Sequence, residues 1–211
     1  LVKELGAKIY LKKFTLKKLY LESDKFFKKS KIFSANPGSS DEKLKANENI
    51  TSEILKENKK IQGIVASVNN GSHFLGLSSF SKKPKFIGVI SKSNLAKSIN
   101  ANSMVEIKNS KNNKRLRLVE ANDKDILRGF KLLYEEGIFV EGSSCAIIGS
   151  LNKIKKIKNI CCVLSGSAHK NLREVQKIIL RSNHFSLNWY EIMLLFKYIL
   201  ISYIDKLDDQ K

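Results

Sequence analysis

The sequence predicts an α/β protein in which a parallel sheet is covered by helices on both faces. Short apolar segments alternate with longer segments whose apolar residues recur every three or four positions, the order of strand, crossover helix and strand. The apolar segments, such as Ile160–Leu164, are continuous, as strands are when both faces of a sheet are buried. The length of 211 residues suits one domain, or one and a fraction, with a core of its own.

Each expected strand is a short apolar segment beside turn residues. We expect strands at Ala7–Leu11, Lys31–Asn36, Gln62–Val68, Pro84–Ile90, Arg117–Val119 and Asn159–Leu164. Phe139–Val140 is expected to be extended, and Pro37–Asp41 has turn chemistry. The polar stretch Lys108–Arg117 is expected to form an exposed loop.

The expected helices have periodic apolar residues or a recognisable start. They lie at Leu1–Gly6, Lys12–Lys31, Ile50–Lys59, Phe74–Phe80, Asn94–Ser98, Ser143–Leu151, most of Asn171–Lys211 and, from a cap at Asn122 or Asp123, through Glu136. Asn49 or Thr51 is the candidate N-cap of the helix at Ile50–Lys59. Gly137 is expected to end the helix that reaches Glu136.

The formal net charge of +19 first suggests a nucleic-acid partner. Of the 39 basic residues only 5 are Arg, the side chain whose planar fork reads guanine and phosphate best. Abundant Lys, Asn and Ile are also what an A/T-rich coding sequence supplies. We therefore interpret the charge as a coding bias spread over a solvated surface, and we do not expect nucleic acid as a partner.

The cysteines and the ends of the sequence point to a cytoplasmic protein without a membrane segment. Cys145, Cys161 and Cys162 form neither a disulfide framework nor a metal-ligand spacing, so we expect no metal. Cys145 is expected to be buried and to serve in packing, and the adjacent Cys161 and Cys162 are expected to point to opposite faces of a strand. No signal peptide is visible, and Tyr190–Ile204 is too short and too charged to span a bilayer.

Small polar residues follow two of the expected strands. In parallel sheets, ligands bind beyond the carboxyl ends of the strands, so these two places are the candidate site. Val68–His73 joins a buried strand to a helix N-terminus, where converging amides and the helix dipole suit a phosphate. Val163–Ser167 ends another strand with hydroxyl groups. Ordinary turn chemistry is the alternative explanation for each segment taken alone.

Taken in order, several segments resemble the pyridoxal-phosphate-dependent enzymes of fold type II, most closely the threonine synthase branch. Glu136–Ala146 is similar to EGIFVEPSSAA, with Gly142 where Pro is usual. Val163–Asn171 resembles VLTGHGLKD, and Ile64–Gly76 resembles VVPVGNGGNLLAG, followed by Pro84–Val89. Lys31–Ile54 resembles the stretch SVNP…GQKTLAFEI, and Leu1–Leu11 resembles the helix and strand that precede it.

The resemblance implies pyridoxal 5′-phosphate as cofactor and assigns roles to six residues. Backbone amides of the turn would hold the phosphate, and a hydroxyl would meet the pyridine nitrogen; in that order the residues are Asn69, Asn70, Gly71, Ser72 and His73, then Ser165. The turn departs from the family, because side chains replace glycines where a phosphate must approach the backbone. A hydroxyl partner, unlike a carboxylate, would leave the pyridine nitrogen largely unprotonated.

No residue of this chain is expected to be catalytic. The family's Schiff-base lysine and its loop for the substrate carboxylate lie upstream of the stretch that Leu1 matches. The chain is therefore expected to be truncated relative to the family, as the C-terminal part of a longer enzyme or as a decayed copy, and not to be competent alone. The implied domains are residues 1–35, the remainder of a small domain; 36–182, the cofactor-binding domain; and 183–211, a helical tail that packs or forms a dimer face.

The resemblance implies a lyase that acts on a small amino-acid substrate, converting O-phosphohomoserine to threonine and phosphate. A threonine or serine dehydratase is the alternative within the family, because it shares the Ser-Gly turn at the pyridine site. An alternative of another class is a basic nucleic-acid-binding module, which would bind with a steep dependence on salt. A homodimer is also an expectation.

Overall fold

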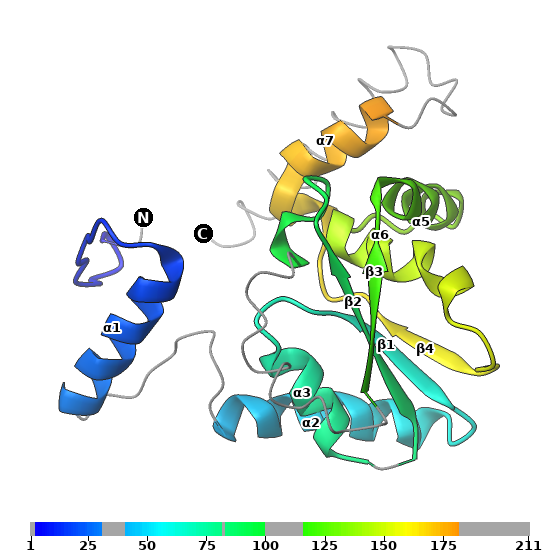
Figure 1. The fold of residues 1–211 in the computed structure, drawn as a ribbon, viewed down its shortest axis with the longest axis horizontal. Helices are drawn as coiled ribbons and strands as arrows, with labels where there is room; N and C mark the ends of the chain where they lie inside the picture. The colour runs from blue at the N-terminus through cyan, green and yellow to red at the C-terminus, as the bar shows by residue number, and fades with distance from the viewer. Residues whose placement is uncertain (1–2, 31–40, 82, 100–115, 182–211) are drawn as a thin grey trace. The chain divides into compact units, whose positions relative to one another are not determined.

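The computed structural model describes residues 3–30, 41–81, 83–99 and 116–181 (Figure 1). The chain divides into two compact units, Leu1–Ser39 and Ser40–Lys211. In the first unit, helix α1 (Leu16–Ser30) begins after Thr15, whose hydroxyl accepts a hydrogen bond from the Lys18 amide at 3.4 Å. This confirms most of the predicted helix at Lys12–Lys31.

The first unit also corrects two predictions. Lys3–Gly6 is a turn with Gly6 at φ +81°, not a helix, and Ala7–Leu11 has no regular structure, so the predicted strand is wrong. A strand persists only when a neighbour completes its backbone hydrogen bonds, and none of the described residues pairs with Ala7–Leu11. Strand-like composition was therefore insufficient here.

The second unit is built on a parallel sheet of four strands, in the order β3-β2-β1-β4. The strands are β1 (Gly63–Ser67), β2 (Lys85–Ser91), β3 (Leu116–Ala121) and β4 (Ile160–Val163). In register, Val65 of β1 lies opposite Ile87 on one side and Cys162 on the other. The predicted parallel α/β fold is confirmed. Strand β3 includes the predicted strand Arg117–Val119 and begins one residue earlier, so Leu116 and Arg117 belong to the sheet and not to the loop predicted at Lys108–Arg117.

Helices cover both faces of the sheet, as predicted (Figure 1). On one face, helices α2 (Asp41–Glu57) and α3 (Ser72–Ser79) pack on Ile64 and Phe86. On the other, α5 (Asp123–Glu135), α6 (Gly142–Gly149) and α7 (Leu172–Arg181) pack on Val65 and Ile87. Cys161 and Cys162 join opposite cores, and Cys145 is fully buried, so these cysteine predictions are confirmed.

Helix α2 starts earlier than predicted. It begins at Asp41, where acidic residues suit the positive end of the helix dipole. Thr51, a proposed N-cap, lies buried within the helix and donates its hydroxyl to the Leu77 carbonyl oxygen at 2.7 Å, and Asn49 is also internal. The short helix expected at Asn94–Ser98 is a single 3₁₀ turn, η1 (Lys97–Ile99).

The predicted strand at Lys31–Asn36 lies outside the described residues. So do all of the turn before Asp41, most of the loop before Leu116, and the tail beyond Arg181. Two further 3₁₀ turns, η3 (Leu151–Lys153) and η4 (Ala168–Asn171), complete the second unit.

Helix α5 begins and ends where the sequence predicts. The Asn122 side chain accepts from the Asp125 amide at 3.0 Å, and the Asp125 carboxylate accepts from the Asn122 amide at 2.9 Å, a reciprocal capping box. At the other end Gly137 adopts φ +72° and donates to the Tyr134 carbonyl at 2.9 Å.

The Asp125 carboxylate also anchors a cluster that joins α5 to the end of α6. Arg128 Nη2 lies 2.9 Å from Oδ1 and Lys153 Nζ lies 2.5 Å from Oδ2. The two helices approach closely because Gly129 and Gly149 lack side chains: a Cβ at either would overlap a carbonyl group of the facing helix. We refer to Asp125, Arg128 and Lys153 as the Asp125 cluster.

Candidate functional site

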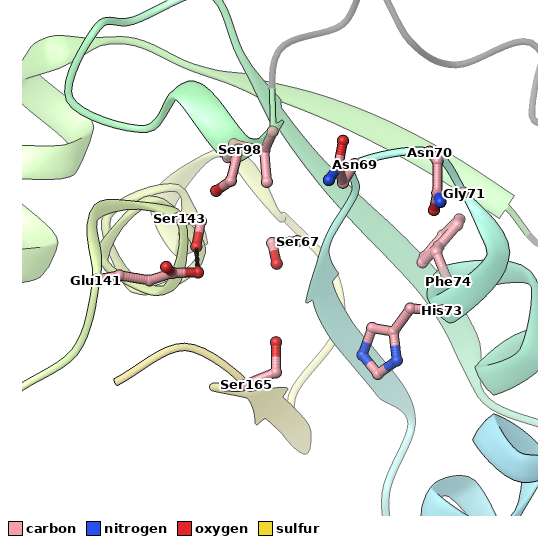
Figure 2. A pocket seen from close by; sticks show the side chains of 11 residues that line it. Ser67, Asn69, Asn70, Gly71, His73, Phe74, Ser98, Glu141, Ser143 and Ser165 are labelled. Carbon is pink, nitrogen blue, oxygen red and sulfur yellow. Dashed lines mark hydrogen bonds between the residues drawn. The ribbon is translucent and has the colours of Figure 1, made fainter. Parts of the chain in front are cut away.

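A pocket of about 160 Å³ opens where the carboxyl ends of β1 and β4 meet (Figure 2). Five segments contribute: the ends of these strands, the start of α3, the turn η1 and the start of α6. The lining residues are Ser67, Asn69, Asn70, Gly71, His73, Phe74, Ser98, Ile99, Glu141, Ser143 and Ser165. The two segments singled out by the sequence therefore face one cavity.

Of the predicted site residues, Asn69, Asn70, Gly71, His73 and Ser165 line this pocket, whereas Ser72 does not. Ser72 is buried, and its hydroxyl donates to Asn70 Oδ1 at 3.1 Å. The sequence predicts a role for the backbone amide of Ser72, and a side chain that turns away from the pocket leaves that prediction untested.

The turn between β1 and α3 presents a helix N-terminus to the pocket. Gly71 adopts φ +110°, a left-handed conformation that favours glycine, and it supplies no side-chain cap to α3. The Leu75 amide bonds back to the Gly71 carbonyl at 2.8 Å, which closes the first helical turn. The earliest amides of α3 have no acceptor within the helix, so they and the helix dipole favour an anion there.

His73 stands on the first turn of α3 and is held from α2. Its Nδ1 lies 2.7 Å from Asn47 Oδ1, and Asn47 Nδ2 donates to the Lys43 carbonyl at 2.8 Å. Its Nε2 is buried and has no hydrogen-bond partner among the described residues. Burial lowers the pKa of His73 below its ordinary value of 6.5, because a charged imidazolium would lose its hydration.

The Ser165 turn is fixed against the start of α6. The Glu141 amide donates to the Gly166 carbonyl at 3.0 Å, and the Gly166 amide donates to Ser144 Oγ at 3.3 Å. A Cβ at Gly166 would overlap the Glu141 carboxylate, so a side chain at this position would have to displace it. The contacts leave Ser165 exposed, with its side chain directed into the cavity (Figure 2).

Glu141 and Ser143 complete the wall on the α6 side, and neither was predicted as a site residue. Glu141 is 7 % exposed, and its Oε1 accepts a hydrogen bond from Ser143 Oγ (Figure 2). Both belong to Glu136–Ala146, the segment most similar to the family, which was the available signal for them. Ser67, Phe74, Ser98 and Ile99 were also missed, and Ser98 and Ile99 reach the site only through the fold.

Gly142, which stands where the family usually has Pro, lies under the segment before η1. A Cβ at Gly142 would overlap the Leu95 carbonyl, so the chain passes closer to α6 here than a proline would allow. That segment carries Ser98 and Ile99 into the pocket wall.

The described part of the pocket wall carries little charge. Glu141 is the one acidic side chain among the described lining residues, and neither lysine nor arginine is among them.

Burial raises the pKa of the nearby Cys145 thiol to about 12, which keeps it protonated and unreactive at neutral pH. The described residues hold no cluster of His, Cys, Asp or Glu that could bind a metal ion. Within the same residues, every helix is too short or too polar to cross a bilayer.

Comparisons with known proteins agree with the fold. The family profile described as pyridoxal-phosphate dependent enzyme matches residues 1–166. No curated protein matches the chain. A mutant hydrogen sulfide-producing enzyme of Fusobacterium nucleatum, complexed with an α-aminoacrylate intermediate, has 21% identity over 90% of this chain and a TM-score of 0.66.

Two plant enzymes have the same fold. Isoform 2 of threonine deaminase from Solanum lycopersicum has 19% identity over 86% of this chain and a TM-score of 0.65. Maize serine racemase has 15% identity over 85% of this chain and a TM-score of 0.59. The chain covers 64%, 62% and 66% of the lengths of the bacterial enzyme, the deaminase and the racemase.

Proposed function

Because this chain belongs to the pyridoxal-phosphate-dependent enzyme family, we propose that the pocket binds pyridoxal 5′-phosphate through α3 and Ser165. The amides that start α3 would hold the phosphate, and the Ser165 hydroxyl would donate to the pyridine nitrogen. The observation that carries this proposal is the meeting of Gly71 and Ser165, far apart in sequence, in the wall of one cavity.

The residues present fit such a group. Gly71 leaves α3 without a side-chain cap, so the helix start is open to a phosphate, and no basic side chain is needed to attract it. Asn70 Oδ1 accepts a hydrogen bond from one of these amides, that of Ser72, at 3.3 Å. At the opposite side Ser165 offers a neutral hydroxyl, which suits a pyridine nitrogen that carries no proton.

When bound, the cofactor supplies an electron sink for charge that develops on the substrate's α-carbon. The chain's own residues bind and orient. The α3 amides would hold the phosphate, Ser165 would donate to the ring nitrogen, and the Glu141–Ser143 pair places a carboxylate in the wall on the α6 side. No described lining residue is a lysine, so the reaction needs a Schiff-base lysine from elsewhere.

We place the activity among the amino-acid dehydratase and racemase types rather than with threonine synthase. The related folds include a threonine deaminase, serine racemases and a fungal L-serine ammonia-lyase, beside a hydrogen sulfide-producing enzyme and an O-ureido-L-serine synthase. A serine or threonine substrate is what the deaminase, the racemases and the ammonia-lyase suggest. The threonine synthase assignment depended most on the stretch Lys31–Ile54, whose first ten residues lie outside the described structure.

Binding is tested with pyridoxine 5′-phosphate, which has no aldehyde and therefore cannot react with the many lysines of this chain. Isothermal calorimetry should give one site per chain, and Ser165→Ala should weaken binding about tenfold, the loss of one buried hydrogen bond. Ser167→Ala is the matched control, because Ser167 is a hydroxyl of the same turn that bonds to His169 outside the pocket. Equal affinity in all three proteins, or no binding at all, would refute the proposal.

The reaction class is tested by product analysis on the full-length enzyme loaded with cofactor. A 2-oxo acid and ammonia from serine or threonine support the dehydratase type. Threonine and phosphate from O-phosphohomoserine would instead establish the threonine synthase type.

A further inference from the structure

We propose that His73 makes phosphate binding in this pocket proton-linked: its imidazole is neutral in the free protein and takes up one proton on Nε2 when the phosphate binds. The inference rests on the proposed function, because it needs a phosphate at the start of α3. It concerns a side chain that neither the family assignment nor the fold explains.

The hydrogen bonds around His73 determine which ring nitrogen carries a proton. Asn47 Nδ2 can only donate, and it donates to the Lys43 carbonyl at 2.8 Å. Asn47 Oδ1 is therefore the atom that faces His73, and it can only accept. The Nδ1 atom, 2.7 Å away, must be the protonated nitrogen. In the neutral ring, Nε2 is left with a lone pair and no proton.

In the free protein, the Nε2 lone pair is buried and makes no hydrogen bond with the described residues. Nε2 is inaccessible to solvent and has no hydrogen-bond partner among the described residues. A buried polar atom without a partner is destabilising, so such atoms need an explanation. His73 lines the pocket, and Figure 2 shows its ring edge turned toward the side where Ser165 lies. A ligand in the pocket is the partner that this atom lacks.

The charges around the ring keep it neutral until an anion arrives. From α2, Lys43 lies one turn before Asn47, and the Glu48 carboxylate is engaged by Ser79 Oγ at 2.8 Å. Across the pocket, the Glu141 carboxylate is engaged by Ser143. Helix α3 has no charged side chain, and neither Ser67 nor Ser165 carries a charge. Burial is the sole cause of the lowered His73 pKa, so none of these groups offsets the cost of desolvation.

A bound phosphate dianion reverses this balance. An opposite charge at about 4–6 Å raises the pKa of a neighbouring base by about 1–3 units. The proton comes from solvent, Nε2 becomes a donor, and the new N–H bonds to a phosphate oxygen. Nδ1 keeps its proton and its bond to Asn47. Between the free and the bound pKa of His73, phosphate affinity therefore falls as pH rises, by up to about tenfold per pH unit.

The test measures pyridoxine 5′-phosphate and inorganic phosphate binding by calorimetry from pH 6 to 8.5, in buffers with different ionisation enthalpies. His73→Gln keeps a polar side chain but cannot take up a proton. Because the ligand ionises in the same range, that variant reports the ligand's own titration and the ratio of the two affinities isolates His73. His169→Gln is the matched control, since His169 is exposed and lies outside the pocket.

We expect the wild-type protein and His169→Gln to take up close to one proton more per site than His73→Gln near pH 7. The ratio of wild-type to His73→Gln affinity should fall about tenfold or more between pH 6 and pH 8. In NMR spectra, the Cε1–H signal absent from His73→Gln should move to its protonated position on phosphate addition. Asn47→Asp places a carboxylate on Nδ1–H, so its His73 should be charged already and the proton uptake should vanish.

The outcomes separate this inference from the proposed function. Ligand binding with the same proton uptake in wild type and His73→Gln overturns the role of His73 and leaves the cofactor pocket in place. Binding to neither protein at any pH overturns both. Pyridoxine, which lacks the phosphate, should show no difference in proton uptake between the two proteins; a difference there would also overturn the inference.

Discussion

Two helices begin at the same edge of the sheet, and they treat their first turns in opposite ways. Helix α5 follows β3 and is capped by its own side chains, Asn122 and Asp125, with Arg128 and Lys153 neutralising the carboxylate. Helix α3 follows β1 and begins at Gly71 with no side-chain cap. A helix start that is capped by side chains therefore contributes to stability, whereas an uncapped start leaves polar backbone atoms for a ligand.

Removing the carboxylate from the closed start has the largest expected effect. Asp125→Ala breaks the capping box and leaves two cations near a buried site, so we expect a loss of about 3 kcal/mol in the free energy of unfolding. Arg128 and Lys153 are partly exposed, so water moderates the cost of removing their carboxylate partner. Urea denaturation measures the change in the free energy of unfolding. Asp123→Ala, which removes an exposed pair with Arg181 at 3.1 Å, is the control and should change stability by less than about 1 kcal/mol. Similar losses in the two variants would contradict the special role of the Asp125 cluster.

Closing the open start is the converse experiment. Gly71→Asp places a carboxylate at the beginning of α3, as Asp125 does at α5, and aspartate tolerates the left-handed conformation better than most residues. We expect affinity for pyridoxine 5′-phosphate to fall by about 100-fold through occupied amides and like-charge repulsion. The midpoint of urea denaturation should change little. Gly137→Asp is the control, because Gly137 also has a positive φ but lies at the end of α5, away from the pocket. Unchanged affinity in Gly71→Asp would show that the phosphate does not use this helix start.

The smallest expected effect concerns the cysteines of α6 and β4. Burial raises the pKa of Cys145 to about 12 and that of Cys162 to about 11, while Cys161 is raised less, being less buried. Iodoacetamide at pH 8 should therefore label Cys161 first and Cys145 only after unfolding, as peptide mass spectrometry can show. Because these pKa values are raised on folding, the stability they contribute is present below about pH 9 and is lost as the pH rises. Rapid labelling of Cys145 in the folded protein would contradict the buried α5–α6 contact.

The sequence was informative where local composition and tertiary structure agree. The strands β1, β2 and β4 are continuous apolar segments, and α5 carries its own start and stop residues, so they were predicted closely. Ala7–Leu11 has a similar composition but lacks a neighbouring strand among the described residues. The early start of α2 was missed because its first turns are polar and pack through backbone contacts with Gly76, which no periodicity reveals.

Half of the candidate site was predictable for the same reason. Turn residues after a strand are recognisable from local composition, and on this basis Asn69–His73 and Ser165 were predicted. Glu141, Ser143 and Ser98 enter the pocket from other elements, and only the folded chain brings them there. The bond from His73 to Asn47 joins residues 26 positions apart, so the tautomer of the imidazole was outside the reach of any local pattern.

The glycines that hold the helices together limit how far this sequence can vary. At Gly129, Gly149, Gly142 and Gly166 an added Cβ would overlap a carbonyl group or the Glu141 carboxylate. Every amino-acid change at a glycine introduces a side chain. Gly129, Gly142 and Gly149 face backbone carbonyls, which cannot move aside without disturbing the fold, whereas Gly166 faces the end of a flexible side chain. The sequence is therefore least free to vary at the first three of these positions, and folded variants of the domain should rarely differ there.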